Sequence, residues 1–137
     1  MAYVYSFEKL TAWQMSRQFA EALYSKNKNF PKEALFGITS QIRRAAISIS
    51  CNLAEGSARF GDREKKRYYE IAYGRPVEVV KLLIICRDLE YLLHEQYTDL
   101  RQEVEKLTIQ INRLVQSYSQ NKEDIHETDI QYSDTPY

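Results

Sequence analysis

The last long apolar segment of the chain carries the pattern that most restricts its fold. Between residues 95 and 120, apolar side chains recur at alternating spacings of three and four: Tyr97, Leu100, Val104, Leu107, Ile111, Leu114 and Tyr118. This heptad repeat places one apolar seam along an α-helix, and the seam requires a partner. The sequence therefore predicts a helix over residues 95–120 that packs against other helices.

Three more segments of similar length precede this helix, and the gaps between them are short. We predict helices over residues 7–27, 40–58 and 63–89, with a preliminary turn over residues 32–36. Ser6 is placed to cap the first helix and Asp62 the third. Pro31 separates the first helix from the second, and Pro76 is expected to kink the third.

The second helix has one apolar side and a marked end. At 100° per residue, five of its apolar side chains fall within an arc of about 80°: Ile38, Ile42, Ala45, Ile49 and Leu53. We expect this arc to face the core, and Gly56 and Gly61 to mark the exit from the helix. Four helices with short connections predict an all-α fold, an up-down-up-down antiparallel bundle.

The charge of the chain is divided unevenly along its length. Residues 1–120 carry 18 basic and 14 acidic side chains, whereas residues 121–137 carry one Lys and five acids. The last segment also lacks apolar periodicity, so we assign residues 1–120 to the bundle and expect 121–137 to be a disordered acidic tail. A body with a net charge of +4 is less basic than most nucleic-acid-binding domains.

Several features predict self-association. The run from Leu82 to Cys86 is apolar on nearly every side of its helix, and the chain contains eleven tyrosines. A single small bundle would expose part of that run, and monomers seldom leave large apolar patches in water. A symmetric homo-oligomer would cover the patch in every copy.

The residues that usually support catalysis or metal binding are scarce. The two histidines, His94 and His126, lie in a turn and in the tail, and neither belongs to a known catalytic motif. We expect both cysteines, Cys51 and Cys86, to be buried thiols in a reducing compartment. The chain is thus predicted to be a non-enzyme without metal or cofactor, and to be cytoplasmic, because no signal peptide or membrane span is evident.

The stretch QIRRAAISISCNLAEGSAR, residues 41–59, has an unusual polar face that lacks Lys. On the helical wheel its polar side chains gather opposite the apolar arc. We call this set the polar stripe: Gln41, Arg44, Ser48, Asn52, Glu55 and Arg59. Arg, Ser and Asn suit directional hydrogen bonding. The stripe could be an ordinary solvent face, a polar contact between subunits, or a site for phosphate or nucleic acid.

A second basic segment, DREKKRYYE, opens the third helix at residues 62–70. Together with the second helix it gives seven candidate contacts to RNA or DNA: Arg43, Arg44, Arg59, Arg63, Lys65, Lys66 and Arg67. Tyr68 and Tyr69 could stack on bases, although Tyr69 could also belong to the core. The alternative function is a scaffold for an unidentified protein partner, with the tail either docking that partner or screening the basic body.

These motifs resemble the small helical-bundle family encoded in intervening sequences of bacterial 23S rRNA genes. The family pattern of Gln-Ile-Arg-Arg-Ala-Ala, then Asn-Leu-Ala-Glu-Gly and an Arg, corresponds to Gln41–Ala46, Asn52–Gly56 and Arg59. The opening Phe-x-x-Leu-x-x-Trp lies at residues 7–13, and FPKEALFGITSQ and LIICRDLEYL are also similar. The resemblance extends over residues 7–119. Arg75-Pro76 departs from it, because relatives usually carry a small residue after Gly74.

The resemblance implies a left-handed four-helix bundle that assembles into a ring, commonly a pentamer. It also implies a distant relationship to the accessory protein of diversity-generating retroelements, a basic barrel that binds nucleic acid and a reverse transcriptase. The expected partners are therefore a second copy of the chain and, as alternatives, RNA or DNA or another protein. No membrane partner is expected.

Overall fold

The structure is a computed structural model that describes residues 2–119. Its four α-helices are α1 (Thr11–Asn27), α2 (Ser40–Ser57), α3 (Asp62–Asp88) and α4 (His94–Ser117). Three short helical turns, Ser6–Lys9, Lys32–Ala34 and Leu35–Thr39, complete the helical elements, and residues 2–119 contain no strand. The all-α prediction is confirmed, while the predicted tail lies outside the described residues.

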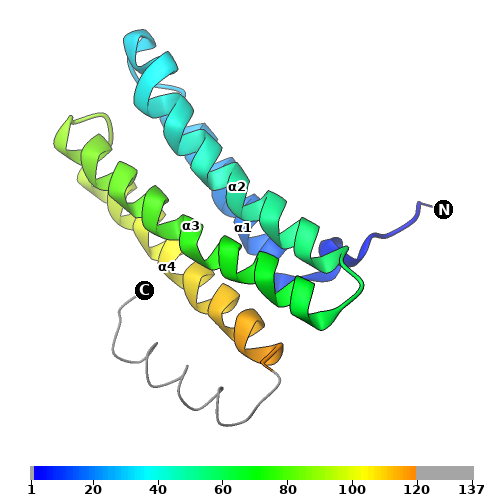
Figure 1. Ribbon diagram of the computed structural model, residues 1–137. Coiled ribbons are helices and arrows are strands. Elements are labelled where there is room, and N and C mark those ends of the chain that lie inside the picture. The colour runs from blue at the N-terminus through cyan, green and yellow to red at the C-terminus, as the bar shows by residue number, and fades with distance from the viewer. Residues whose placement is uncertain (1, 120–137) are drawn as a thin grey trace.

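Each helix packs against its neighbours in the sequence, and α4 returns to pack against α1 (Figure 1). This arrangement is consistent with the predicted up-down-up-down order. The core contains most of the predicted seam of α4, from Tyr97 to Ile111. At the end of α4, Val115 takes the core position, and Leu114 and Tyr118 pack at its edge.

The predicted start of the first helix is wrong. Helix α1 begins at Thr11 because Leu10 is extended, and residues 6–9 form a separate 3-10 turn. That turn brings the Phe7 ring to 4.7 Å from the Trp13 ring. Ser6 does not cap a helix; its hydroxyl donates to the carbonyl and the hydroxyl oxygens of Ser57, at 3.1 Å each.

Helix α3 continues through Pro76, which is itself buried. Gly61, rather than the predicted Asp62, is its N-cap residue, and Asp62 lies in its first turn. In the apolar run, Leu82, Leu83 and Cys86 are buried, but Ile85 remains 45% exposed. The run therefore fills the core on one side and leaves apolar surface on the other.

The two cysteines differ in their surroundings, so one of the two predictions was wrong. Cys86 is buried in the core, and this burial raises the pKa of its thiol to about 11. Cys51 is exposed, because it lies on the side of α2 that points away from the bundle. The apolar character of the segment around Cys51 indicated burial, but its angular position on the helix determines the outcome.

Helix α2 ends at Ser57, one residue after the predicted exit at Gly56, but Gly56 is not a C-cap: it is a buried residue inside α2. The ring of Tyr69 from α3 packs directly over it. A Cβ atom at Gly56 would lie 2.7 Å from Tyr69 Cε1 and 3.1 Å from Tyr68 Cβ. Tyr69 is only 1% exposed, and its burial, with Tyr118 beside it, raises the pKa of its phenol to about 12.

We predict that Gly56→Ala lowers the free energy of unfolding by about 1–3 kcal/mol, because the added methyl group overpacks the Tyr69 contact. The matched control is Gly74→Ala in α3, where nothing lies within 4 Å of the new Cβ. That substitution should raise stability by up to about 1 kcal/mol through helix propensity. Urea unfolding followed by circular dichroism measures both. Equal effects of the two substitutions would contradict the close-contact interpretation.

Candidate nucleic-acid and subunit interface

The connection between α2 and α3 is short and is held by one side chain from the Ser6–Lys9 turn and one from α3 itself. The carbonyl of Ser57, at the end of α2, accepts hydrogen bonds from the Ser6 hydroxyl at 3.1 Å and from Lys65 Nζ at 2.8 Å. Carbonyl groups at a helix C-terminus carry partial negative charge, so an ammonium group stabilises them. Lys65, a predicted nucleic-acid contact, is thus engaged in closing the turn.

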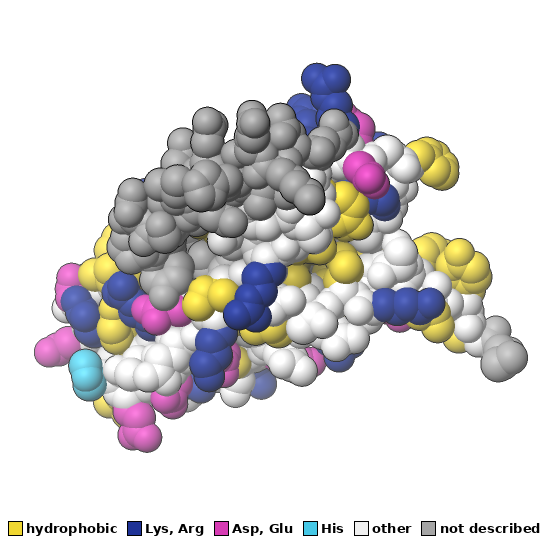
Figure 2. All heavy atoms as spheres, turned by 90° about the horizontal axis from the view of Figure 1, so that it is seen from below, with side chains coloured by type: hydrophobic (Ala, Val, Ile, Leu, Met, Phe, Trp, Pro, Cys, Tyr) yellow, Lys and Arg dark blue, Asp and Glu magenta, His cyan; other side chains and the backbone are white. Residues whose placement is uncertain are grey.

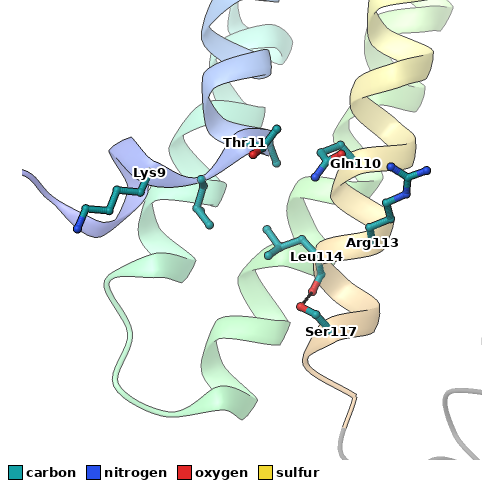
Figure 3. Close-up of a pocket in the computed structure, with 8 residues that line it drawn as sticks. Lys9, Thr11, Gln110, Arg113, Leu114 and Ser117 are labelled. Carbon is teal, nitrogen blue, oxygen red and sulfur yellow. Dashed lines mark hydrogen bonds between the residues drawn. The ribbon is translucent and has the colours of Figure 1, made fainter.

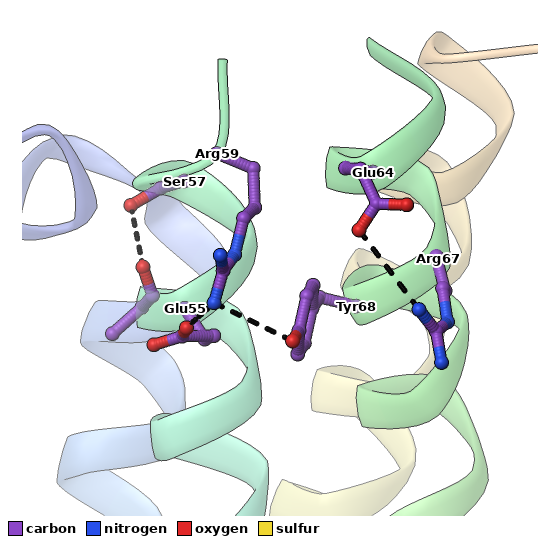
Figure 4. Close-up of polar contacts among 7 residues, drawn as sticks. Glu55, Ser57, Arg59, Glu64, Arg67 and Tyr68 are labelled. Carbon is purple, nitrogen blue, oxygen red and sulfur yellow. Dashed lines mark hydrogen bonds and ion pairs between the residues drawn. The ribbon is translucent and has the colours of Figure 1, made fainter. Parts of the chain in front are cut away.

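Arg59 is also engaged within the protein. It forms an ion pair with Glu55, one turn earlier in α2, and its guanidinium lies 4.9 Å from the centre of the Tyr68 ring. Figure 4 shows Arg59 between Glu55 and Tyr68, with a hydrogen bond of 3.4 Å from Nη2 to the Tyr68 hydroxyl. This end of the polar stripe therefore connects α2 to α3.

Three predicted cations remain outside these contacts. Arg63 and Arg67 are exposed and Lys66 is half-buried, all on the first two turns of α3. Arg67 reaches Glu64 only at 3.9 Å, and no ion pair among residues 2–119 includes Arg63 or Lys66. Between residues 58 and 70, five cations face three acids, Asp62, Glu64 and Glu70, which leaves a modest positive excess.

The two aromatic residues chosen from the sequence are poorly placed to stack on bases. Tyr69 is buried in the core, and Arg59 covers the Tyr68 ring. Sequence analysis missed Phe60, which lies in the turn itself and is fully exposed (104%). Its signal was an aromatic residue directly before Gly61 in a predicted turn, flanked by arginines.

Arg43 and Arg44 lie at the other end of α2, about 20 Å along the helix axis from Arg59. Arg43 faces α1, where its guanidinium donates to Asn27 Oδ1 at 2.8 and 3.0 Å and covers the Tyr24 ring. Arg44 is exposed. The seven predicted cations thus divide into two groups rather than forming one surface. On the face drawn in Figure 2, Lys and Arg side chains are interspersed with Asp and Glu.

Three residues of the polar stripe line a groove between α2 and α3. Gln41, Arg44 and Ser48 border a hollow of about 510 Å³ together with Arg75 and Glu78 from α3. The Asn52 amide donates to the Ser48 carbonyl at 2.8 Å. The sequence did not identify Arg75 and Glu78 as the residues opposite the stripe, because that pairing depends on how the two helices align.

A second hollow of about 340 Å³ lies between the start of α1 and the end of α4. Figure 3 shows the amino group of Lys9 and the guanidinium of Arg113 directed to opposite sides of this region. Its charged groups therefore do not converge on one point. Residues 2–119 contain no group of His, Cys, Asp and Glu that could hold a metal ion. None of their helices combines the length and the apolar character that crossing a membrane requires.

The family described as 23S rRNA-intervening sequence protein matches residues 8–113, which include α1, α2, α3 and most of α4. The chain belongs to this family. The 23S rRNA-intervening sequence protein motif at residues 41–59 thus forms α2 and the start of the turn, where it contributes both core residues and the polar stripe. No curated protein matches the chain.

The fold is similar to a crystal structure of a protein with unknown function from the S23 ribosomal protein family of Bacteroides thetaiotaomicron. The TM-score is 0.70 at 20% sequence identity, and the match covers 77% of this chain and 98% of the other. At this identity the similarity supports the helical fold of this chain and carries no residue roles.

We predict that the Lys65→Met and Lys66→Met variants differ in their free energy of unfolding, although the two residues are neighbours in the sequence. Lys65→Met removes the hydrogen bond to the Ser57 carbonyl and should lower the free energy of unfolding by about 1 kcal/mol. Lys66→Met changes the same charge without removing an observed contact, so its effect should stay within about 0.5 kcal/mol. Urea unfolding measures the difference, and indistinguishable midpoints would rule out the closing role of Lys65.

Proposed function

We propose that this chain is a non-enzymatic helical module that self-assembles and binds nucleic acid through the turn between α2 and α3. The observation that carries the proposal is the group of cations at the start of α3. Arg63, Lys66 and Arg67 lie on the first two turns of α3; Arg63 and Lys66 form no ion pair among residues 2–119, and Arg67 has only a 3.9 Å contact with Glu64. Lys and Arg held in this way neutralise phosphates and release counterions from the nucleic acid.

The modest charge of this site fits a contact to a few phosphates per chain. Asp62 and Glu64 stabilise the first turn of α3 and reduce the local positive potential. We therefore expect binding that depends strongly on salt and only weakly on base sequence, with no preference for RNA or DNA set by these cations alone.

The nucleic-acid proposal predicts that Arg63→Glu with Lys66→Glu weakens binding at low salt by at least about tenfold. The slope of log affinity against log salt concentration should also become smaller in magnitude by about two, because two phosphate contacts are lost. Fluorescence anisotropy with labelled RNA and DNA measures both effects.

The matched control for this titration is Lys28→Glu with Lys32→Glu, which reverses two exposed cations at the opposite end of the bundle. That variant has the same total charge but should keep most of the affinity. Absence of binding to any nucleic acid at low salt would refute the proposal, and equal losses in both double variants would refute this location.

The self-assembly part of the proposal is supported by apolar side chains exposed on α2, on α3 and on the helical turn Leu35–Thr39 that precedes α2. Phe36, Ile47, Ile85 and Leu89 are exposed, and Phe36 reaches 93%. On α2, Ile47 lies on the same side of the helix as Arg44 and Cys51, where a typical surface helix would carry Lys and Glu. A second copy of the chain is the partner that would cover this surface in every subunit.

We expect light scattering on a size-exclusion peak to give the mass of an oligomer; the family resemblance, rather than the surface, specifies five copies. Ile47→Glu and Arg44→Glu should shift the mass toward that of the monomer, because both place a carboxylate in the contact. Lys106→Glu, on the exposed side of α4, is the control. A wild-type mass that stays at one chain would refute self-assembly, and a dimer or tetramer would refute the ring of five.

The alternative function, a scaffold for an unidentified protein, is favoured by the same exposed apolar side chains. It differs from the first proposal in one measurable respect. A scaffold would keep its oligomeric mass and its fold but would bind neither RNA nor DNA at low salt. The acidic tail, which could dock such a partner, lies outside the described residues.

A further inference from the structure

We propose that the α2–α3 turn binds single-stranded nucleic acid, with one unpaired base stacked on Phe60. The inference rests on the proposed nucleic-acid function and specifies the class of ligand. Phe60 is the most exposed large apolar side chain of residues 2–119, at 104%. A phenyl ring left in water contributes almost nothing to the stability of the fold through burial, and the ring is therefore free to contact a ligand.

The turn holds Phe60 in a defined place although its ring is free of the bundle. The backbone N–H of Arg59 donates to the Gly56 carbonyl at 3.2 Å, and the N–H of Lys65 donates to the Gly61 carbonyl at 3.0 Å. The Arg59 side chain is fixed by Glu55 and Tyr68. Both ends of the turn are therefore anchored, and a ligand that stacks on the ring does not have to order a loose loop.

The charges beside Phe60 favour a nucleic acid over a neutral partner. Arg63 follows the ring by three residues, and Lys66 and Arg67 follow on the next turn of α3. A strand whose base stacks on Phe60 can place its neighbouring phosphates along these cations. Aromatic rings combined with a basic track are typical of proteins that bind single strands.

The ring also distinguishes single strands from duplexes. A base inside a duplex is already stacked on both faces, so its face cannot reach Phe60 unless the duplex opens. Duplex phosphates can still contact Arg63, Lys66 and Arg67, and a duplex would therefore bind through charge alone. We infer that single strands bind more tightly and that the whole difference depends on Phe60.

The test compares two exposed apolar residues at opposite ends of the bundle, neither of them in the proposed self-assembly surface. Phe60→Ala and Leu93→Ala each remove an exposed apolar side chain, because Leu93, directly before α4, is 70% exposed, and neither should affect folding. Fluorescence anisotropy is measured at low salt with a mixed-sequence strand of about 15 nucleotides and with the duplex of the same length. Phe60→Trp serves as the conservative variant, since indole also stacks on bases.

We expect Phe60→Ala to weaken single-strand binding by about tenfold and to change duplex binding less than twofold. Phe60→Trp should retain the single-strand affinity, and Leu93→Ala should leave the binding of both ligands unchanged. An equal change, or no change, on both ligands would overturn the stacking proposal while leaving phosphate binding intact. A wild-type protein that binds neither ligand would instead refute the proposed function itself.

A further measurement separates base stacking from a contact between copies. If Phe60 covers a neighbouring subunit, Phe60→Ala should lower the mass measured by light scattering. Loss of single-strand affinity together with that loss of mass would overturn the inference. An unchanged mass with selective loss of single-strand affinity would support it.

Discussion

The close approach of α2 and α3 at Gly56 is the contact on which the rest of this bundle end depends. Because Gly56 has no side chain, the Tyr69 ring can lie against the backbone of α2 and still be fully buried beside Tyr118. The first turns of α3 are thereby held close to the last turn of α2. That closeness places Lys65 within hydrogen-bond distance of the Ser57 carbonyl and Tyr68 under the Arg59 guanidinium. A bulkier residue at position 56 would separate all of these groups together.

The parts of the fold that depend on helical periodicity could be predicted from the sequence. The α4 seam and the α2 arc repeat every three or four residues, and burial follows that repeat from Ile42 to Leu53 and from Tyr97 to Ile111. The parts that depend on tertiary contacts could not be predicted. Ser6 has the composition of a helix cap, but its hydroxyl binds Ser57, which lies 51 residues away. Gly56 lies near a helix end, as a C-cap glycine does, and only the position of Tyr69 explains its burial.

The candidate site could be predicted by location but not by the role of each residue. Lys65 and Lys66 are identical in type and adjacent in sequence, but they point about 100° apart on α3, so one closes the turn and the other remains near solvent. Arg43 and Arg44 divide in the same way, toward Asn27 and toward the groove beside Arg75. A helical wheel gives these directions, but the partner in each direction depends on which helix packs there. Phe60 was missed because helical periodicity says nothing about a residue in a turn.

The separation of the two ends of α2 allows one small helix to serve both proposed roles. The exposed apolar side chains and the Arg44 groove lie toward its N-terminus, whereas the cations and Phe60 follow its C-terminus about 20 Å away. Assembly through the first region would thus leave the second uncovered. Rotation about a single axis brings the same turn of every copy to the same rim of a ring. A site with only a small positive excess would then be repeated around that rim, and one strand that reaches several copies would bind much more tightly than a single turn allows.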